Sequence, residues 1–395
     1  MYPVVTQPAL VTRLRSIALG VGVIGLILLL MGLLFDRAQF FHSYLFAFIF
    51  WMGIAAGCLA LLMLQHLTGG GWGLVIRRVL EAATRTLPLL AALFVPIIIG
   101  ARWIYPWTHS EEMAKSQALV EKSKHYLNLP FFTLRAAIYF AIWLTLAFFL
   151  NRWSLTQDYT ADRQASKKMS QLSGPGMVLF VLTVTFASID WTMSLDPEWS
   201  STIYGFIFVG AWSLSALAFV IAIMAILSNH EPMKHLVAHL HFHDLGKLLL
   251  ALVMLWAYFA FSQFLIIWSG NLPEEIRWYR PRLQGGWGAI ALSVVILHFA
   301  FPFLFLLSRS LKRNPGKLVI VAILILVMRL FDLLWMIAPQ FTGAVFHLSW
   351  MDLVAPVGLG GLWLATFFWQ LGKRALLPVN DPQYETVLEQ AQVSH

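Results

Sequence analysis

The chain has 395 residues, of which 59% are hydrophobic and only 12% are charged, and its mean hydropathy is +0.74. A water-soluble fold of this length cannot bury so much apolar surface, so the composition excludes a soluble protein. The single cysteine, Cys58, excludes an internal disulfide, a cysteine-ligated iron–sulfur cluster and a CxxCH haem attachment site.

Ten apolar runs are each long enough to cross a hydrocarbon core about 30 Å thick. Each must be helical, because only a helix satisfies its own backbone polar groups in lipid. The first follows Arg13 and Arg15 without a small-residue cleavage site, which favours a retained span over a removable signal peptide. The ten runs are 16–34, 43–66, 87–105, 130–150, 176–195, 202–228, 246–270, 286–308, 317–338 and 351–371.

Lysine and arginine are distributed unequally over the two sides of these spans. One side carries seventeen of the 27, the other nine, and Arg329 lies inside a span. The richer side includes both termini, so we expect both to be cytoplasmic. The net charge of +8 follows mostly from this bias and gives no indication of nucleic-acid binding.

The chain contains an internal repeat of four spans. Residues 43–50 (SYLFAFIF) match residues 201–208 (STIYGFIF), and Asp190 with Pro197 matches Asp332 with Pro339. Because four is even, both copies have the same orientation in the membrane, which makes this a parallel repeat. The predicted fold is an all-α polytopic membrane protein with ten transmembrane helices, in which helices 2–5 and 6–9 form two parallel-repeat four-helix bundles beside two peripheral helices. The predicted divisions are the N-terminus with helix 1 (1–40), the first bundle (41–199), the second bundle (200–341), helix 10 (342–374) and a polar cytoplasmic tail (375–395).

Three segments outside the spans are distinctive. Residues 72–85 have the mixed pattern of a short interfacial helix on the cytoplasmic side. On the outer side, residues 106–129 form the longest loop, and residues 271–287 are dense in arginine and aromatic residues.

Asp190 and Asp332 each lie about 15 residues into a helix that starts at the cytoplasmic side, which places both in the outer third of the membrane at about 1.5 Å per residue. An ionised carboxylate there is costly unless it is paired or hydrated, so each is either a protonatable site or a structural acid. Arg329 precedes Asp332 by three residues and can pair with it on the same helix face. Asp190 has Ala187 at that position, so we expect it to lack a local partner and to be the acid more often neutral. The spacing also leaves open that Arg329 reaches Asp190.

His298 lies near the middle of the eighth span. It could be a packed core histidine, a proton relay, a quinone hydrogen-bond partner or a haem ligand. Core packing is the leading interpretation, ahead of a relay or quinone contact. Haem is disfavoured because His42, His66 and His347 lie at span edges and form no evident axial pair.

The histidines at 235, 239, 241 and 243 have the spacing of a metal cluster, since His235 and His239 could share a helix face. The first repeat has Arg77 and Glu81 at those two positions, which favours a solvated interfacial helix over a proton-collecting surface or a metal site.

Three long stretches resemble a known family. They are residues 190–205 (DWTMSLDPEWSSTIYG), 42–53 (HSYLFAFIFWMG), and 268–279 (WSGNLPEEIRWY) with 285–287 (GGW). In their order and place they are similar to the ActF subunits of bacterial alternative complex III, a group within the NrfD-like (polysulfide reductase membrane subunit) family. The resemblance extends over roughly residues 40–372, and that family's fold has ten helices with two four-helix bundles.

The resemblance implies a subunit of a complex that oxidises membrane quinol in the bacterial inner (cytoplasmic) membrane. In that complex, electrons pass through iron–sulfur clusters and c-type haems on partner subunits to a periplasmic acceptor. The expected partners are a second NrfD-like ten-helix subunit, which is associated with menaquinol or a similar quinol, a periplasmic iron–sulfur subunit, and multihaem and monohaem c-type cytochromes. Subunits of this group carry no redox cofactor, and a role in proton movement has been proposed for them. The candidate proton carriers are Asp190, Asp332, Arg329 and His298, with Glu81 and His239 at the cytoplasmic mouth.

Two other functions are compatible with the sequence. A quinol-binding subunit of the same complex predicts a lipid-accessible pocket near Asp190 or Asp332. A secondary solute transporter is compatible with parallel repeats, but the breaks at Pro96 and Pro302 have no counterpart in the other repeat. The Arg- and aromatic-rich outer segment at 274–287 also favours docking of peripheral proteins over transport.

Overall fold

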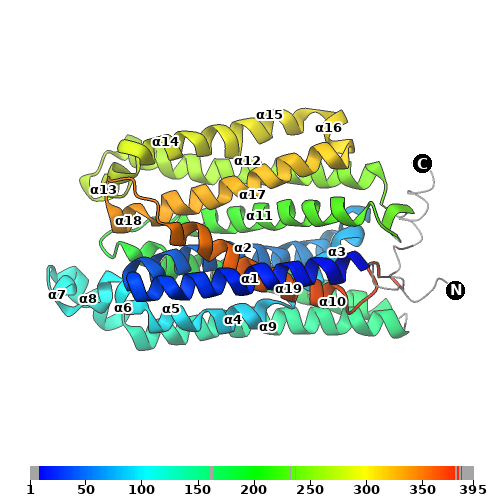
Figure 1. Cartoon of the computed structure of the whole chain (residues 1–395), viewed down its shortest axis with the longest axis horizontal. Helices are drawn as coiled ribbons and strands as arrows, with labels where there is room; N and C mark the ends of the chain where they lie inside the picture. Colours follow the sequence, from blue (N-terminus) through cyan, green and yellow to red (C-terminus); the bar gives the residue numbers. More distant parts are fainter. Residues whose placement is uncertain are drawn as a thin grey trace.

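The computed structural model consists of long helices that lie nearly parallel to its longest axis (Figure 1). It describes residues 9–160, 163–231, 233–235, 237–378, 380, 381 and 384, and these contain no β-strand. Ten helices, or series of helices in line, are long and apolar enough to cross a membrane. They are α1 (Ala9–Phe35), α2 (Arg37–Thr68), α3 to α5 (Gly71–Thr84, Leu87–Leu93, Val95–Ile99), α9 (Leu129–Thr160), α10 (Arg163–Trp191), α11 (Tyr204–Leu227), α12 (His239–Gly270), α14 with η4 and α15 (Gly285–Ser293, Val294–Ala300, Phe301–Leu307), α17 (Pro315–Ile337) and α19 (Trp350–Leu371). The ten predicted spans are confirmed as helices, and the described chain is consistent with a multi-pass membrane protein.

Short helices lie at the two ends of these spans (Figure 1). We call one end the α13 end; it carries α6 (Ala101–Ile104), η1 (Pro106–Thr108), α7 (Ser110–Met113), α8 (Gln117–His125), η2 (Met193–Leu195), α13 (Pro273–Arg282) and α18 (Pro339–Thr342). The opposite, α16 end carries η3 (Met233–His235) and α16 (Arg309–Arg313), together with α3 and the residues that follow α19. Because the spans alternate in direction, α1 begins and α19 ends at the same, α16 end. The lysine and arginine count predicts that this end is cytoplasmic.

Helices α2 and α11 form the centre of the molecule. In the most apolar part of each, 94% and 83% of the residues are buried, against 28% in α1. Helix α2 packs on α3, α10, α11 and α19, whereas α11 packs on α10, α12 and α17. These two helices therefore join the helices of the first predicted bundle to those of the second, while the equivalence of the two bundles stays a prediction.

Helix α3 differs from the interfacial helix predicted at 72–85. Its residues from Gly73 to Thr84 are all buried, and they pack against α2, α9, α11, α12 and α19. The mixed pattern arises because Arg77, Arg78 and Glu81 are paired inside the protein instead of facing water. The predicted short helix is therefore present, but it is enclosed by other helices instead of lying on the surface of the bundle.

Helix α1 is attached to the bundle mainly through α19, and glycines on both helices allow their backbones to touch. A Cβ added to Gly361 would lie 2.3 Å from the Cα of Gly22, and one added to Gly25 would lie 2.6 Å from the Cα of Gly358. In lipid the hydrophobic effect does not drive helices together, so close van der Waals packing at small residues provides the attraction. The α1–α19 contact therefore depends on backbone proximity.

We predict that Gly361→Val and Gly22→Val destabilise the protein by about 1–3 kcal/mol, because the new side chains collide with the facing backbone. The matched control is Gly20→Val on the same helix, where an added Cβ meets nothing within 4 Å. The measurement is the thermal unfolding midpoint in mild detergent. Equal midpoints for all three variants would contradict the proposed backbone contact.

Candidate functional site

Asp190 is fixed at the α13 end by an arginine from the neighbouring helix. The guanidinium of Arg135 donates to both carboxylate oxygens at 2.8 Å, and the hydroxyl of Tyr139 donates to one of them at 2.7 Å. The Arg135 and Asp190 side chains are only 8% and 1% exposed. A two-pronged pair of this kind combines strong charge attraction with a defined orientation.

The position of Arg135 follows from the first turns of α9. Arg135 and Tyr139 are four residues apart, so both face α10 from the same side of the helix. The guanidinium also lies 3.8 Å from the ring centre of Tyr126 and 4.4 Å from that of Phe131, so aromatic faces cover its remaining surface. As predicted, Asp190 has Ala187 and no arginine three residues before it on its own helix, but Arg135 of α9 pairs with it instead. The absence of a local partner is therefore no reason to expect a neutral carboxyl group.

The second intramembrane acid pairs as its spacing predicts. Arg329 and Asp332 form a buried ion pair within α17. The alternative pairing of Arg329 with Asp190 is not formed, since each acid has its own arginine. The two candidate acids are thus held differently, one across two helices and the other along one.

His298 lies in the π-helical segment η4 and is fully buried. The wider turn arises because Pro302 has no N–H to offer the carbonyl of His298, and the Phe301 N–H bonds to Ile296 five residues back. The imidazole meets the edge of the Trp256 ring at 4.4 Å, and neither ring nitrogen has a hydrogen-bond partner among the described residues.

Glu81 is the centre of a buried charged network at the α16 end. Its carboxylate accepts from Arg77 at 3.0 Å, from Arg78 at 2.7 Å and from Ser154 at 2.5 Å. A third arginine, Arg374, reaches it from beyond α19 at 3.2 Å. The sequence analysis names Glu81 as a candidate for the cytoplasmic entry of protons. In the structure its carboxylate is enclosed by three arginines.

His239 is separate from this network. It lies exposed at the start of α12, where its Nδ1 bonds to the carbonyl of Arg313 at 2.9 Å. Its neighbour His241 is buried and accepts from the Ala238 N–H. Across the part of the chain that the structure describes, no group of three His, Cys, Asp or Glu side chains could hold a metal ion.

The stretches at 42–53, 190–205 and 268–279 meet in one layer at the α13 end. The Trp199 ring stacks on Trp278 at 4.8 Å, and its N–H donates to the carbonyl of Glu275 at 3.1 Å. The rings of Phe48 and Trp191 meet edge to face with their centres 6.0 Å apart, which links the first stretch to the second. We call the residues of these three stretches the aromatic layer.

Arginines of α13 tie this layer together. Arg277 pairs with Glu198 and lies 3.5 Å from Asp196, whose pKa is raised by burial against the opposing effect of Arg277. Arg282 stacks on Trp278 at 3.8 Å and donates to the carbonyl of Met336 at 2.7 Å. Burial lowers the pKa of Arg282 to about 9, which still leaves its guanidinium charged at neutral pH. Arg277 and Arg282 of the Arg-rich segment are therefore held in place by contacts with the rest of the fold.

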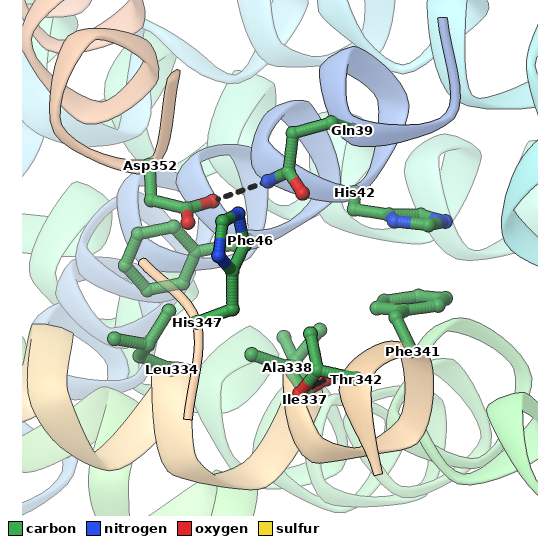
Figure 2. A pocket seen from close by; sticks show the side chains of 10 residues that line it. All are labelled: Gln39, His42, Phe46, Leu334, Ile337, Ala338, Phe341, Thr342, His347 and Asp352. Atoms are coloured by element: carbon green, nitrogen blue, oxygen red, sulfur yellow. Dashed lines mark hydrogen bonds between the residues drawn. The ribbon is translucent and has the colours of Figure 1, made fainter. Parts of the chain in front are cut away.

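A small pocket opens beside this layer, between α2, α17 and α19 (Figure 2). Asp352 accepts from Ser43 at 2.6 Å and from Gln39 at 3.1 Å, and His42 stacks on Phe341 at 3.5 Å. The cavity volume of about 20 Å³ is enough for about one water molecule and far too small for a quinone ring. The pocket therefore offers a carboxylate to water at the α13 end.

Three residues of these sites were missed in the sequence. Arg135 appears in the sequence only as one of the nine basic residues of the poorer side. Its pairing with Asp190 is not evident there, because the two residues are 55 positions apart. Tyr139 could have been noticed, since it shares a helix face with Arg135. Asp352 stands three residues after Ser349 in a capping-box spacing, which signals the helix start but not the contact with Ser43.

Comparison of the chain with protein-family models finds no match, and comparison with curated proteins finds no similar protein.

We predict that Arg135→Gln destabilises the protein by about 3–5 kcal/mol, because Asp190 then remains as a buried carboxylate without its cation. Tyr139→Phe removes a single hydrogen bond and should cost about 1 kcal/mol. The double variant with Asp190→Asn should be more stable than Arg135→Gln alone. Thermal unfolding in detergent measures all three, with the exposed Arg102→Gln as the control; if Arg135→Gln costs no more than Tyr139→Phe, the pair does not hold α9 to α10.

Proposed function

We propose that this chain is an integral membrane subunit of a quinol-oxidising electron-transfer complex of the alternative complex III type. In this proposal it carries no redox cofactor, scaffolds the complex and conducts protons. The observation that carries the proposal is the aromatic layer: stretches that resemble that family, and that lie far apart in the sequence, contact one another at the α13 end.

The rigidity of the α13 end supports docking of peripheral proteins. Trp199, Trp278 and Arg277 are locked by stacking, hydrogen bonds and ion pairs, so the surface above them is preorganised. Binding to a rigid surface costs less side-chain ordering than binding to a mobile one. In this proposal the partners are an iron–sulfur subunit and c-type cytochromes, which hold the iron–sulfur clusters and haems, while a second NrfD-like subunit binds the quinol.

The buried charged groups support proton conduction. Ionisable residues inside a membrane are costly and are most often found on ion or proton pathways. Glu81 and His239 lie at the α16 end, His298 lies within a span, and Asp190 and Asp332 lie towards the α13 end. The proposed order of carriers is from the α16 end to the α13 end, with Arg329 holding the charge of Asp332.

The arginine pairs determine how such a carrier works. A proton that reaches Asp190 competes with Arg135 for the carboxylate, so protonation loosens the contact between α9 and α10. Tyr139 stays within hydrogen-bond distance and can pass or accept a proton from the same oxygen. The pair thus couples the arrival of a proton to a local change in helix packing.

The test of membership is a mild-detergent purification of the tagged chain from its native membrane. We predict co-elution of a multihaem cytochrome c, an iron–sulfur protein and a second ten-helix subunit, identified by mass spectrometry. A reduced-minus-oxidised spectrum should show c-type haem. A colourless protein that elutes alone would contradict the proposal and favour a solute transporter.

The test of proton conduction is the proton-to-electron ratio of the purified complex in liposomes. We predict that Asp190→Asn and Asp332→Asn lower this ratio, because an amide cannot carry a proton between the two sides. Asp244→Asn is the control, since Asp244 is 38% exposed and pairs with Lys247 at the α16 end. An unchanged ratio in correctly assembled variants would remove both residues from the pathway.

A further inference from the structure

The residues that follow α19 cross the α16 end of the first group of helices. Leu376 and Leu377 are only 4% and 5% exposed, so this segment is packed in place. We call residues 372–378, 380 and 381 the C-terminal cover. The predicted polar tail at 375–395 thus begins with residues held against the bundle, and most of its remainder lies outside the described residues.

Hydrogen bonds and ion pairs fasten the cover directly over Glu81. Arg374 donates to the Glu81 carboxylate at 3.2 Å, and Asp381 accepts from Arg77 at 2.7 Å. The Asn380 side chain donates to the carbonyl of Asp158 at 2.7 Å. One end of the cover therefore pairs with an anion of the buried network, and the other end pairs with a cation of the same network.

The charges of the network allow the cover to leave. With the cover in place, three cations face three anions: Arg77, Arg78 and Arg374 against Glu81, Asp158 and Asp381. Without it, two cations still face two anions, because one arginine and one aspartate depart together. Arg85, which bonds to carbonyl oxygens beside the network, is the same in both states.

This balance makes the electrostatic cost of opening smaller than the cost of breaking an ordinary buried ion pair. Removing one partner from a buried ion pair costs several kcal/mol, because it leaves an uncompensated charge. Here the departing Arg374 and Asp381 enter water, and Glu81 keeps Arg77, Arg78 and Ser154 as partners. The bundle thus keeps its remaining charges paired when the cover opens, and the burial of Leu376 and Leu377 favours the closed position.

We propose that the C-terminal cover closes Glu81 off from the aqueous phase at the α16 end and opens to let water and protons reach it. This inference rests on the proposed proton-conducting function, which it deepens by naming the element that regulates proton access. Closing also prevents a continuous water path, so protons do not leak when the complex is idle.

The experiment measures how fast a water-soluble thiol reagent labels a cysteine inside the network. Cys58 is the only native cysteine, so Cys58→Ala provides a thiol-free full-length chain. Ser154→Cys then places a thiol of similar size beside Glu81, at a position that is fully buried. An exposed reference is Tyr159→Cys on the same helix, where the side chain is 82% exposed.

We expect Ser154→Cys to react much more slowly than Tyr159→Cys. Adding Arg374→Gln and Asp381→Asn should speed its labelling at least tenfold, which corresponds to about 1.4 kcal/mol removed from the closed state. The matched control is Lys373→Gln, which neighbours Arg374 but contacts Trp369 instead of the network, and should leave the rate unchanged. Equal rates with and without the two cover substitutions would overturn the proposal.

Hydrogen exchange on the unaltered chain provides a second test that needs no substitution. We expect the backbone amides of residues 373–377 to exchange through a local opening while α3 and the end of α19 stay protected. Exchange of these amides only together with α19 would overturn an independently opening cover. Neither test requires quinol oxidation, so the cover can stand if the proposed electron-transfer role fails, and the reverse also holds.

Discussion

The fold depends on one constraint: inside a membrane there is no water to solvate a charge, so each charged side chain needs a partner within the protein. Asp190 obtains its partner from α9, Asp332 from its own helix, and Glu81 from α3 and from the segment after α19. Two of these three solutions join elements that are distant in the sequence. The charges therefore help to determine which helices lie side by side, in addition to being candidates for function.

The two ends of the molecule are held together by different kinds of contact. At the α13 end, stacked tryptophans and arginines bonded to carbonyl groups hold segments that are distant in the sequence together. At the α16 end, a network of ion pairs encloses Glu81 and is completed by a short segment of the C-terminal region. A fixed surface suits the docking of other proteins, whereas a charge-balanced network suits an element that opens and closes. This difference connects the proposed scaffold role with the proposed regulation of proton access.

The sequence predicts the ten spans well, because length and hydropathy decide which helices can cross a membrane. It also predicts the Arg329–Asp332 pair, since a spacing of three residues is a local property of a helix. It does not predict the partner of Asp190, because Arg135 lies on another helix and only tertiary packing brings them together. The burial of Glu81 is not predicted for the same reason: nothing in the neighbouring sequence indicates that Ser154 and Arg374 enclose it.

The claim that arginine pairs hold the interior together is tested by the protonation state of the buried aspartates, measured by infrared spectroscopy on the purified chain at neutral pH. The C=O stretching band of a protonated carboxyl group is compared between the unaltered protein and the Asp190→Asn and Asp332→Asn variants. We expect that neither substitution removes intensity from this band at rest, because Arg135 lies against Asp190 and Arg329 against Asp332. A band that disappears in either variant would show a neutral buried acid and would contradict the view that arginine pairs hold this interior together.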